Sequence, residues 1–113
     1  MSTIFKDIID KKIKTDLIHE DDICIAINDI NPVAPIHILI IPKKEISTIN
    51  DLNTEDKEII GHLTYIAKKI ARDRNIDKNG YRLIFNCNDD GGQTVYHIHL
   101  HLIGGRKFNW PPG

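Results

Sequence analysis

The stretch YHIHLHLIGG, residues 96–105, sets three histidines at every second position between branched aliphatic side chains. In a β-strand alternate side chains lie on the same face, so His97, His99 and His101 are predicted to line one side of a sheet while the aliphatic residues between them face the core. A rise of about 3.4 Å per residue places consecutive histidine Cα atoms about 6.8 Å apart and the outer two about 13.5 Å apart. The glycine pair at the end of the stretch is predicted to stop the strand.

Four other strands are predicted from apolar runs or from alternation of apolar and polar residues. The segment DLIHEDDICIAINDINP, residues 16–32, is interpreted as two strands around a turn at residues 20–22. The segment IHILIIP is almost continuously apolar, which is typical of a central strand. In chain order, the predicted strands are the two within residues 16–32, then 36–42, 81–86 and finally 97–103 with the histidines.

Two helices are expected. The segment from Asn53 or Thr54 to about Arg74 begins with a capping residue and acids, and continues with an apolar stripe at helical spacing. A shorter helix near the N-terminus could be capped by Ser2 or Thr3. The order of helix, three strands, helix and two strands, joined by short turns, predicts an α+β fold. Its sheet is expected to be five-stranded and mainly antiparallel.

The composition limits the classes of function. A length of 113 residues suits one domain, residues 1–113. A net charge of −1, with 41% hydrophobic and 27% charged residues, favours neither nucleic acid nor a membrane surface as a partner. The longest apolar run, residues 36–41, is far short of the ~20 residues that a membrane span needs. The first residues lack the apolar core of a signal peptide, and only Cys24 and Cys87 are present, so we expect reduced thiols and a cytoplasmic location.

Three histidines on one face allow more than one interpretation. Two imidazoles at alternate strand positions can chelate one zinc ion, but the outer two histidines are too far apart to bind the same ion. A further ligand would have to come from His37, Asp89 or Asp90. A second interpretation is that the three histidines lie on a half-exposed sheet face and have no catalytic or binding function. The third is nucleophilic chemistry on a phosphate, because a neutral imidazole is a good nucleophile near pH 7. The middle residue, His99, has a neighbour on either side that can contact the same substrate.

The loop before the histidines favours the third interpretation. The segment CNDDGGQTV contains Gly91 and Gly92, which let backbone N–H groups approach an anion, and Gln93 and Thr94 add side-chain donors. The loop lacks a Walker lysine at the required place, and the sequence has no acidic cluster to hold Mg²⁺, so a P-loop is excluded. A phosphate site is therefore expected beside the histidines.

HIHLHLIGG fits the pattern His-x-His-x-His-x-x, with x hydrophobic, and on these residues the chain resembles the histidine-triad (HIT) family. Further segments are similar to its Hint branch, the purine nucleoside phosphoramidases: TIFKDII, EDDICIAINDINPVAPIHILIIPKKEIS, GYRLIFN, DGGQTVYHIHLHLIGGR and the ending NWPPG. The resemblance spans nearly the whole chain. It implies a homodimer in which two five-stranded sheets pair into a ten-stranded sheet.

The resemblance also implies a reaction, the hydrolysis of a purine nucleoside 5′-phosphoramidate, such as adenosine monophosphate joined to an amine, through a nucleotidyl-histidine intermediate. It implies no metal or other cofactor. The implied catalytic residues are the nucleophile His99, its triad partners His97 and His101, and His37, which helps to orient the triad. The implied nucleotide-binding residues are Asp29 for the ribose, Phe5, Ile27 and Ile30 for the base, and Asn86, Gly92, Gln93, Thr94 and His101 for the phosphate, with Trp110 on the leaving-group side.

Some departures leave the function open. Relatives often carry serine where Thr94 stands and an aromatic residue where Ile27 stands, so the base preference is open. His101 in place of glutamine speaks against the uridylyltransferase branch. The alternatives are hydrolysis of dinucleoside polyphosphates or acyl-adenylates, and a nucleotide-binding partner protein whose hydrolysis is incidental. His19 and His62 match no functional position and are expected to be surface residues.

Overall fold

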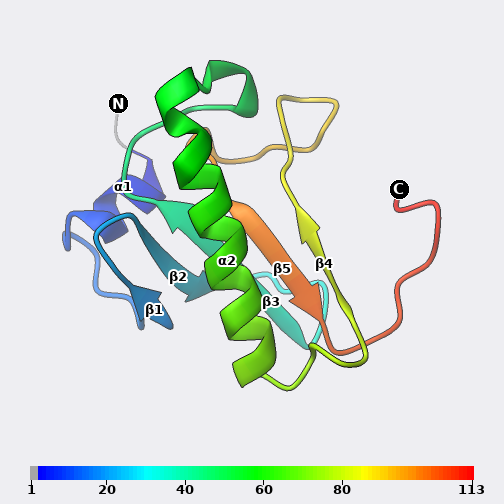
Figure 1. The fold of residues 1–113 in the computed structure, drawn as a ribbon. Coiled ribbons are helices and arrows are strands. Elements are labelled where there is room, and N and C mark those ends of the chain that lie inside the picture. The colour runs from blue at the N-terminus through cyan, green and yellow to red at the C-terminus, as the bar shows by residue number, and fades with distance from the viewer. Residues whose placement is uncertain (1–2) are drawn as a thin grey trace.

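Figure 1 shows the computed structural model, which describes residues 3–113. The chain runs in the expected order of helix, three strands, helix and two strands, with two short 3₁₀ turns before the second helix. The elements are α1 (Ile4–Ile9), β1 (His19–Glu20), β2 (Cys24–Asn28), β3 (Ile36–Pro42), η1 (Ile49–Asp51), η2 (Thr54–Asp56), α2 (Lys57–Asp73), β4 (Tyr81–Ile84) and β5 (Leu100–Gly104).

The five strands form one sheet in the order β1-β2-β3-β5-β4, and every neighbouring pair is antiparallel. β3 is central, as its apolar run predicts: Ile40 lies opposite Ala26 of β2 on one side and Leu100 of β5 on the other. β1 and β4 lie at the two edges. The predicted α+β fold, with a five-stranded antiparallel sheet and two helices, is confirmed.

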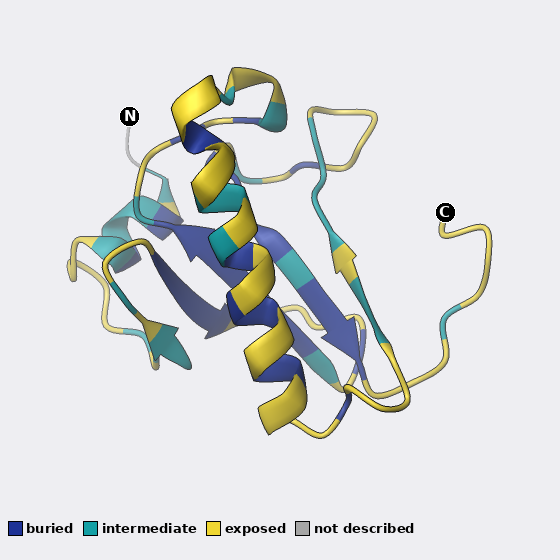
Figure 2. Ribbon diagram, in the orientation of Figure 1, coloured by how far each residue is buried: buried dark blue, intermediate teal, exposed yellow. Residues whose placement is uncertain are grey.

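α2 lies across one face of the sheet (Figure 1). Leu63, Ile66 and Ile70 form the predicted apolar stripe, and they are buried against side chains of β2, β3 and β5. Ala67 and Ala71 are fully buried, because their short side chains let the helix approach the sheet closely. Figure 2 shows buried and exposed residues alternating along α2, as expected of an amphipathic helix. Within residues 3–113, no helix is both long and apolar enough to cross a membrane.

α1 packs on the opposite face of the sheet. The Thr3 hydroxyl accepts a hydrogen bond from the Lys6 N–H at 3.2 Å, so Thr3 is the N-cap, whereas Ser2 lies outside the described residues. Phe5 and Ile8 are buried against the side chains of β2 and β3 that point away from α2. The central strands therefore bury both of their faces, and the second face, beneath α1, carries the candidate site.

β5 is shorter than predicted and excludes two of the three histidines. It begins at Leu100, so His97 and His99 precede it in irregular backbone. The register of β3 and β5, continued by two residues, would set Ile98 opposite Pro42, and a proline has no N–H for a ladder. The Ile98 N–H donates instead to a carbonyl in the loop after β3, at 2.8 Å. The prediction that all three histidines lie in one strand is therefore wrong.

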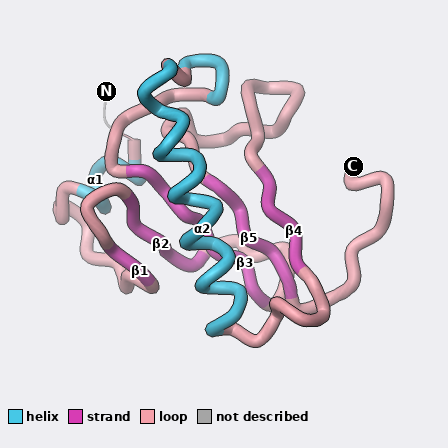
Figure 3. Tube along the Cα trace, in the orientation of Figure 1, coloured by secondary structure: helices cyan, strands magenta, loops and turns pink. Residues whose placement is uncertain are grey.

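Other boundaries shift by a few residues. β4 ends at Ile84, two residues before the predicted end. The predicted helical segment begins with the 3₁₀ turn η2, and α2 itself ends at Asp73, with Arg74 as the C-cap. Figure 3 shows that the connection from β4 to β5 and the C-terminal tail are loops. The glycine-containing segment expected to meet a phosphate is part of this connection.

Candidate active site

His37, on β3, is held between a backbone donor and the third triad histidine. The Val33 N–H donates to His37 Nδ1 at 3.1 Å, so a neutral His37 carries its proton on Nε2. From there it donates to His101 Nδ1 at 2.9 Å and also lies 3.2 Å from Asp29 Oδ2. His101 therefore keeps its own proton on Nε2, where a ligand could accept it. In this way His37 fixes the tautomer and the orientation of His101.

His99 is fixed by the backbone of its own segment. Its Nδ1–H donates to the His97 carbonyl at 2.8 Å, which leaves the neutral ring with an unprotonated Nε2. His97 Nε2 donates to the Pro42 carbonyl at 2.7 Å, and His97 Nδ1 is buried without a hydrogen-bond partner among residues 3–113. The ring centroids of His99 and His101 are 4.9 Å apart. The middle histidine thus has the tautomer that a nucleophile requires.

Burial keeps the three triad histidines neutral at pH 7. It is the largest cause of the lowered pKa values of His97, His99 and His101. For His101, repulsion by the rings of His99 and His37 adds to burial, and its pKa falls to about 4. The nearby carboxylate of Asp29 opposes this shift without cancelling it. His99 and His101 therefore offer a lone pair and an N–H donor to a ligand, not positive charge.

A cleft of about 290 Å³ lies beside His99. Phe5 forms part of its lining and packs edge-on against the His99 ring, with centroids 4.9 Å apart. Ile30 is 87% exposed and offers apolar surface to the cleft. The structure brings seven of the predicted site residues together in this lining: Phe5, Ile27, Asp29, Ile30, Thr94, His99 and His101.

Gln93 is placed differently from the prediction. Its amide nitrogen donates to the carbonyls of Ser47 at 2.7 Å and Val95 at 3.0 Å, and its Oε1 accepts from the Asn88 N–H at 2.9 Å. The side chain is buried, and both amide protons are used, so no side-chain donor remains for a phosphate. Gln93 instead pins the loop that carries the two glycines.

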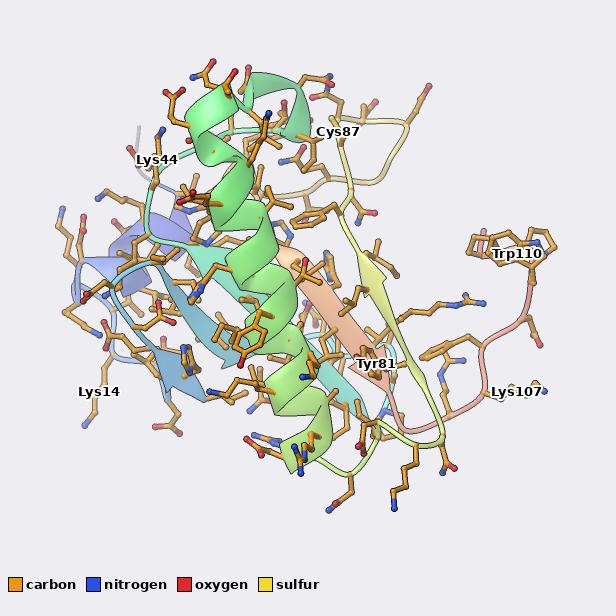
Figure 4. The ribbon with its side chains drawn as sticks, viewed as in Figure 1. Lys14, Lys44, Tyr81, Cys87, Lys107 and Trp110 are labelled. Carbon is orange, nitrogen blue, oxygen red and sulfur yellow. The ribbon has the colours of Figure 1, made fainter. Side chains whose placement is uncertain are left out.

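The remaining predicted residues lie outside the described lining of the cleft. Gly92 has a φ of 81°, which favours glycine, and a Cβ on Gly91 would lie 2.5 Å from the Cys87 carbonyl oxygen. Asn86 is half-buried just after β4, and the cleft lining contains neither Asn86 nor Gly92. Trp110 is 82% exposed on the C-terminal tail, which extends away from the sheet beyond β4 (Figure 4).

Several supports of the site were not predicted. The Val33 backbone both orients His37 through its N–H and accepts, through its carbonyl, from the Arg106 guanidinium at 3.0 and 3.2 Å. Ile13 and Thr15 add to the cleft from the irregular segment after α1. Backbone contacts leave no side-chain pattern in a sequence. The only available signal was the pair of prolines around the Val33 loop, which indicated a constrained loop but not its purpose.

His19 and His62, expected to be surface residues, are partly buried and share a hydrogen-bond partner. His19 Nε2 on β1 and His62 Nε2 on α2 donate to the same oxygen, Asp21 Oδ2, at 2.6 and 2.7 Å. Asp21 Oδ1 accepts from the N–H groups of Ile23 and Cys24 at 2.8 and 2.9 Å. Burial would raise the pKa of Asp21, but these hydrogen bonds outweigh it and hold that pKa below its ordinary value. No pattern in the sequence indicates this second cluster.

The fold and the cleft define a small α+β protein in which two adjacent histidine rings, those of His99 and His101, line a ligand-sized cleft. The sequence profile of the HIT domain matches residues 10–108. Over 106 residues the chain is 50% identical to an uncharacterized HIT-like protein of Buchnera aphidicola, covering 94% of this chain and 95% of that one.

Solved structures are similar as well. A HIT family hydrolase from Legionella pneumophila superposes with a TM-score of 0.96 at 49% identity, covering 99% of this chain and 100% of that one. A histidine triad nucleotide-binding protein from Candida albicans has a TM-score of 0.82 at 27% identity, covering 97% of this chain and 83% of that one. The chain therefore belongs to the HIT family, as its histidine pattern predicted, and it resembles the hydrolases of that family.

Proposed function

We propose that the protein is a Hint-type enzyme that hydrolyses purine nucleoside 5′-phosphoramidates, with His99 as the nucleophile. The observation that carries this proposal is the hydrogen bond from His99 Nδ1 to the His97 carbonyl. Because of it, the Nε2 lone pair is free on a residue that lines the cleft. Burial lowers the pKa of His99 and keeps this lone pair available at pH 7.

The reaction consists of two displacements at phosphorus. First, His99 Nε2 bonds to the α-phosphorus, the phosphorus–nitrogen bond to the amine breaks, and the amine leaves with a proton from solvent. Water then attacks the same phosphorus and gives up a proton, the bond to Nε2 breaks, and the mononucleotide is released. In both steps His101 donates its Nε2–H, which His37 fixes, to a phosphoryl oxygen. The proposed chemistry uses no metal.

The cleft offers contacts for the nucleoside. Asp29 Oδ1 accepts from the Asn31 N–H at 2.8 Å, which fixes the carboxylate while leaving lone pairs for the two ribose hydroxyls. Phe5, Ile27 and Ile30 supply apolar surface for the base. Because aliphatic side chains outnumber aromatic ones here, we expect the base to be held by burial more than by ring stacking.

The loop before the triad offers contacts for the phosphate. Thr94 is exposed and lines the cleft, and its hydroxyl is the side-chain donor of this loop that we assign to the phosphate. Gly92 and Asn86 are proposed as further contacts, through a backbone N–H and a side-chain amide. Gln93 does not contact the phosphate itself but positions the loop through its three hydrogen bonds.

We further propose that residues 1–113 act as one HIT domain in a homodimer with a ten-stranded sheet. β4 lies at an edge of the sheet, and Leu83 on it is 36% exposed, so this edge is open to a second copy. The exposed Trp110 tail would then shape the leaving-group side of the partner's cleft. Two free cysteines fit a reducing, cytoplasmic setting.

The test is steady-state hydrolysis of matched substrates: adenosine, guanosine and uridine 5′-phosphoramidates beside a diadenosine polyphosphate. We expect turnover of the two purine phosphoramidates to exceed that of the uridine compound and of the polyphosphate. Turnover of the polyphosphate alone would assign the enzyme to dinucleotide hydrolysis. Tight binding of adenosine monophosphate with turnover of no substrate would favour a nucleotide-binding partner protein.

A further inference from the structure

We propose that His19, Asp21, Cys24 and His62 form a binding site for a divalent metal ion of the zinc type. The four side chains come from β1, the turn after it, the start of β2, and α2, and they converge on Asp21 Oδ2. That oxygen lies 2.6 Å from His19 Nε2, 2.7 Å from His62 Nε2 and 3.8 Å from Cys24 Sγ. The ligating atoms of His19, Asp21 and Cys24 all lie within 4.8 Å of one another.

Three of the ligand atoms already lie close enough to share one ion, and His62, which contacts Asp21, supplies the fourth once its ring turns toward the ion. Zinc bonds of about 2.0–2.3 Å place neighbouring ligand atoms roughly 3.3–3.7 Å apart in a tetrahedron. The distance from Cys24 Sγ to Asp21 Oδ2 exceeds this spacing by only about 0.1 Å, whereas each imidazole must withdraw from the oxygen by roughly 0.6–1.1 Å. The side chains of His19 and His62 are 27% and 26% exposed, so both rings can move by this amount without repacking the core.

The charges of the ligands suit a partly buried ion. Asp21 brings one negative charge, and Cys24 brings a second when its thiol loses its proton, so together they neutralise a divalent ion. Cys24 is fully buried, where a net charge would be costly. Binding releases one proton per ion, from Cys24, and moves the imidazole protons of His19 and His62 from Nε2 to Nδ1.

The backbone already orients the central carboxylate. Asp21 Oδ1 accepts from the N–H groups of Ile23 and Cys24, which directs Oδ2 toward the two imidazoles. Such outer contacts are what hold a metal ligand in position. The β1–β2 hairpin thus supplies a His-x-Asp-x-x-Cys chelate, and His62 joins α2 to it. An ion here would fasten the helix to the edge of the sheet.

A competing place for an ion is the active site. The ligating atoms of Asp29, His37 and His101 also lie within 4.8 Å of one another. That group contains no thiol, and His37 uses Nδ1 for the Val33 N–H and Nε2 for His101. In the Cys24 cluster the two imidazoles contact only a carboxylate that is itself a ligand, and zinc prefers thiolate and imidazole ligands, so the Cys24 cluster is the favoured site.

Titration with Co²⁺ distinguishes the two places by their ligands. A cobalt ion bound by Cys24 has a thiolate-to-cobalt charge-transfer band in the near ultraviolet, together with the visible bands of tetrahedral coordination. We expect one equivalent to bind and to be displaced by Zn²⁺. Cys24→Ser should lose the charge-transfer band, and His19→Gln and His62→Gln should each weaken binding at least about tenfold. Cys87→Ser removes the other free thiol and should leave the spectrum unchanged.

Two results would overturn the proposal. The absence of any spectral change at millimolar cobalt would leave the cluster as a hydrogen-bonded contact between the hairpin and α2. The ion would be assigned to the active site if cobalt gave visible bands without the thiolate band, and if His37→Gln abolished those visible bands. Because Cys24 lies in the core, circular dichroism melts should verify that each variant is folded, and the two histidine variants test the site with the thiol intact. None of these readouts depends on phosphoramidate turnover.

Discussion

Replacing Gln93 with alanine should destabilise the whole protein, because this side chain fastens three segments of backbone. Its side-chain amide donates hydrogen bonds to the carbonyls of Ser47 and Val95 and accepts one from the N–H of Asn88. At about 1 kcal/mol net for each hydrogen bond, the variant loses roughly 3 kcal/mol of its free energy of unfolding. For 113 residues, an unfolding entropy of about 2.1 cal/mol/K per residue converts this loss to a melting temperature lower by roughly 13 °C.

Calorimetry and urea unfolding measure this loss directly, and the neighbouring Thr94→Ala is the matched control. Thr94 is exposed and lines the cleft, so its replacement should lower the melting temperature by no more than about 2 °C while raising KM for the phosphoramidate. If Gln93→Ala unfolds like the wild type and only raises KM, the side chain contacts the phosphate directly. The structural role that we derive from its hydrogen bonds would then be refuted.

Three further predictions concern the chemistry. Burial lowers the pKa of His99, and the proposed reaction needs the neutral form of that ring. We therefore expect kcat/KM to stay level above pH 6.5, the ordinary pKa of histidine, and to fall only at lower pH. A pH profile with an acid limb centred above pH 7 would contradict this. His37→Ala removes the donor that fixes His101, so kcat should fall at least about tenfold while the dissociation constant for adenosine monophosphate changes little; an unchanged kcat would mean that the relay is not used. EDTA should leave turnover unchanged at temperatures well below melting, and a loss of activity that zinc restores would place a metal in the reaction.

The layers of the fold could be predicted because their signals are periodic. Side chains alternate along β2, so Ile25 and Ile27 pack with α1 while Ala26 packs with α2. β3 buries both faces, so its continuous apolar run correctly indicated the centre of the sheet. The position of His99 near a glycine-containing loop followed from their adjacency in the chain.

The remaining features depend on contacts between distant residues. His97 donates to the carbonyl of Pro42, 55 residues away in the sequence, and Asp21 contacts His62, 41 residues away. The early end of β5 depends on which residue lies opposite Ile98, and only the register reveals that. A lone polar residue in a loop, such as Gln93, belongs to no periodic pattern that would tell whether it faces the core or a ligand.

The proposed nucleophilic role of His99 is tested most directly by alkaline quenching of the enzyme during turnover of adenosine 5′-phosphoramidate, followed by mass spectrometric mapping of the covalent adduct. The wild type should carry one adenosine monophosphate, bonded to His99. His99→Ala should carry none and should lose turnover, yet bind adenosine monophosphate about as tightly, since the proposed ribose and phosphate contacts lie on other residues. An adduct on another residue, or turnover of His99→Ala at the wild-type rate, would contradict the proposed mechanism.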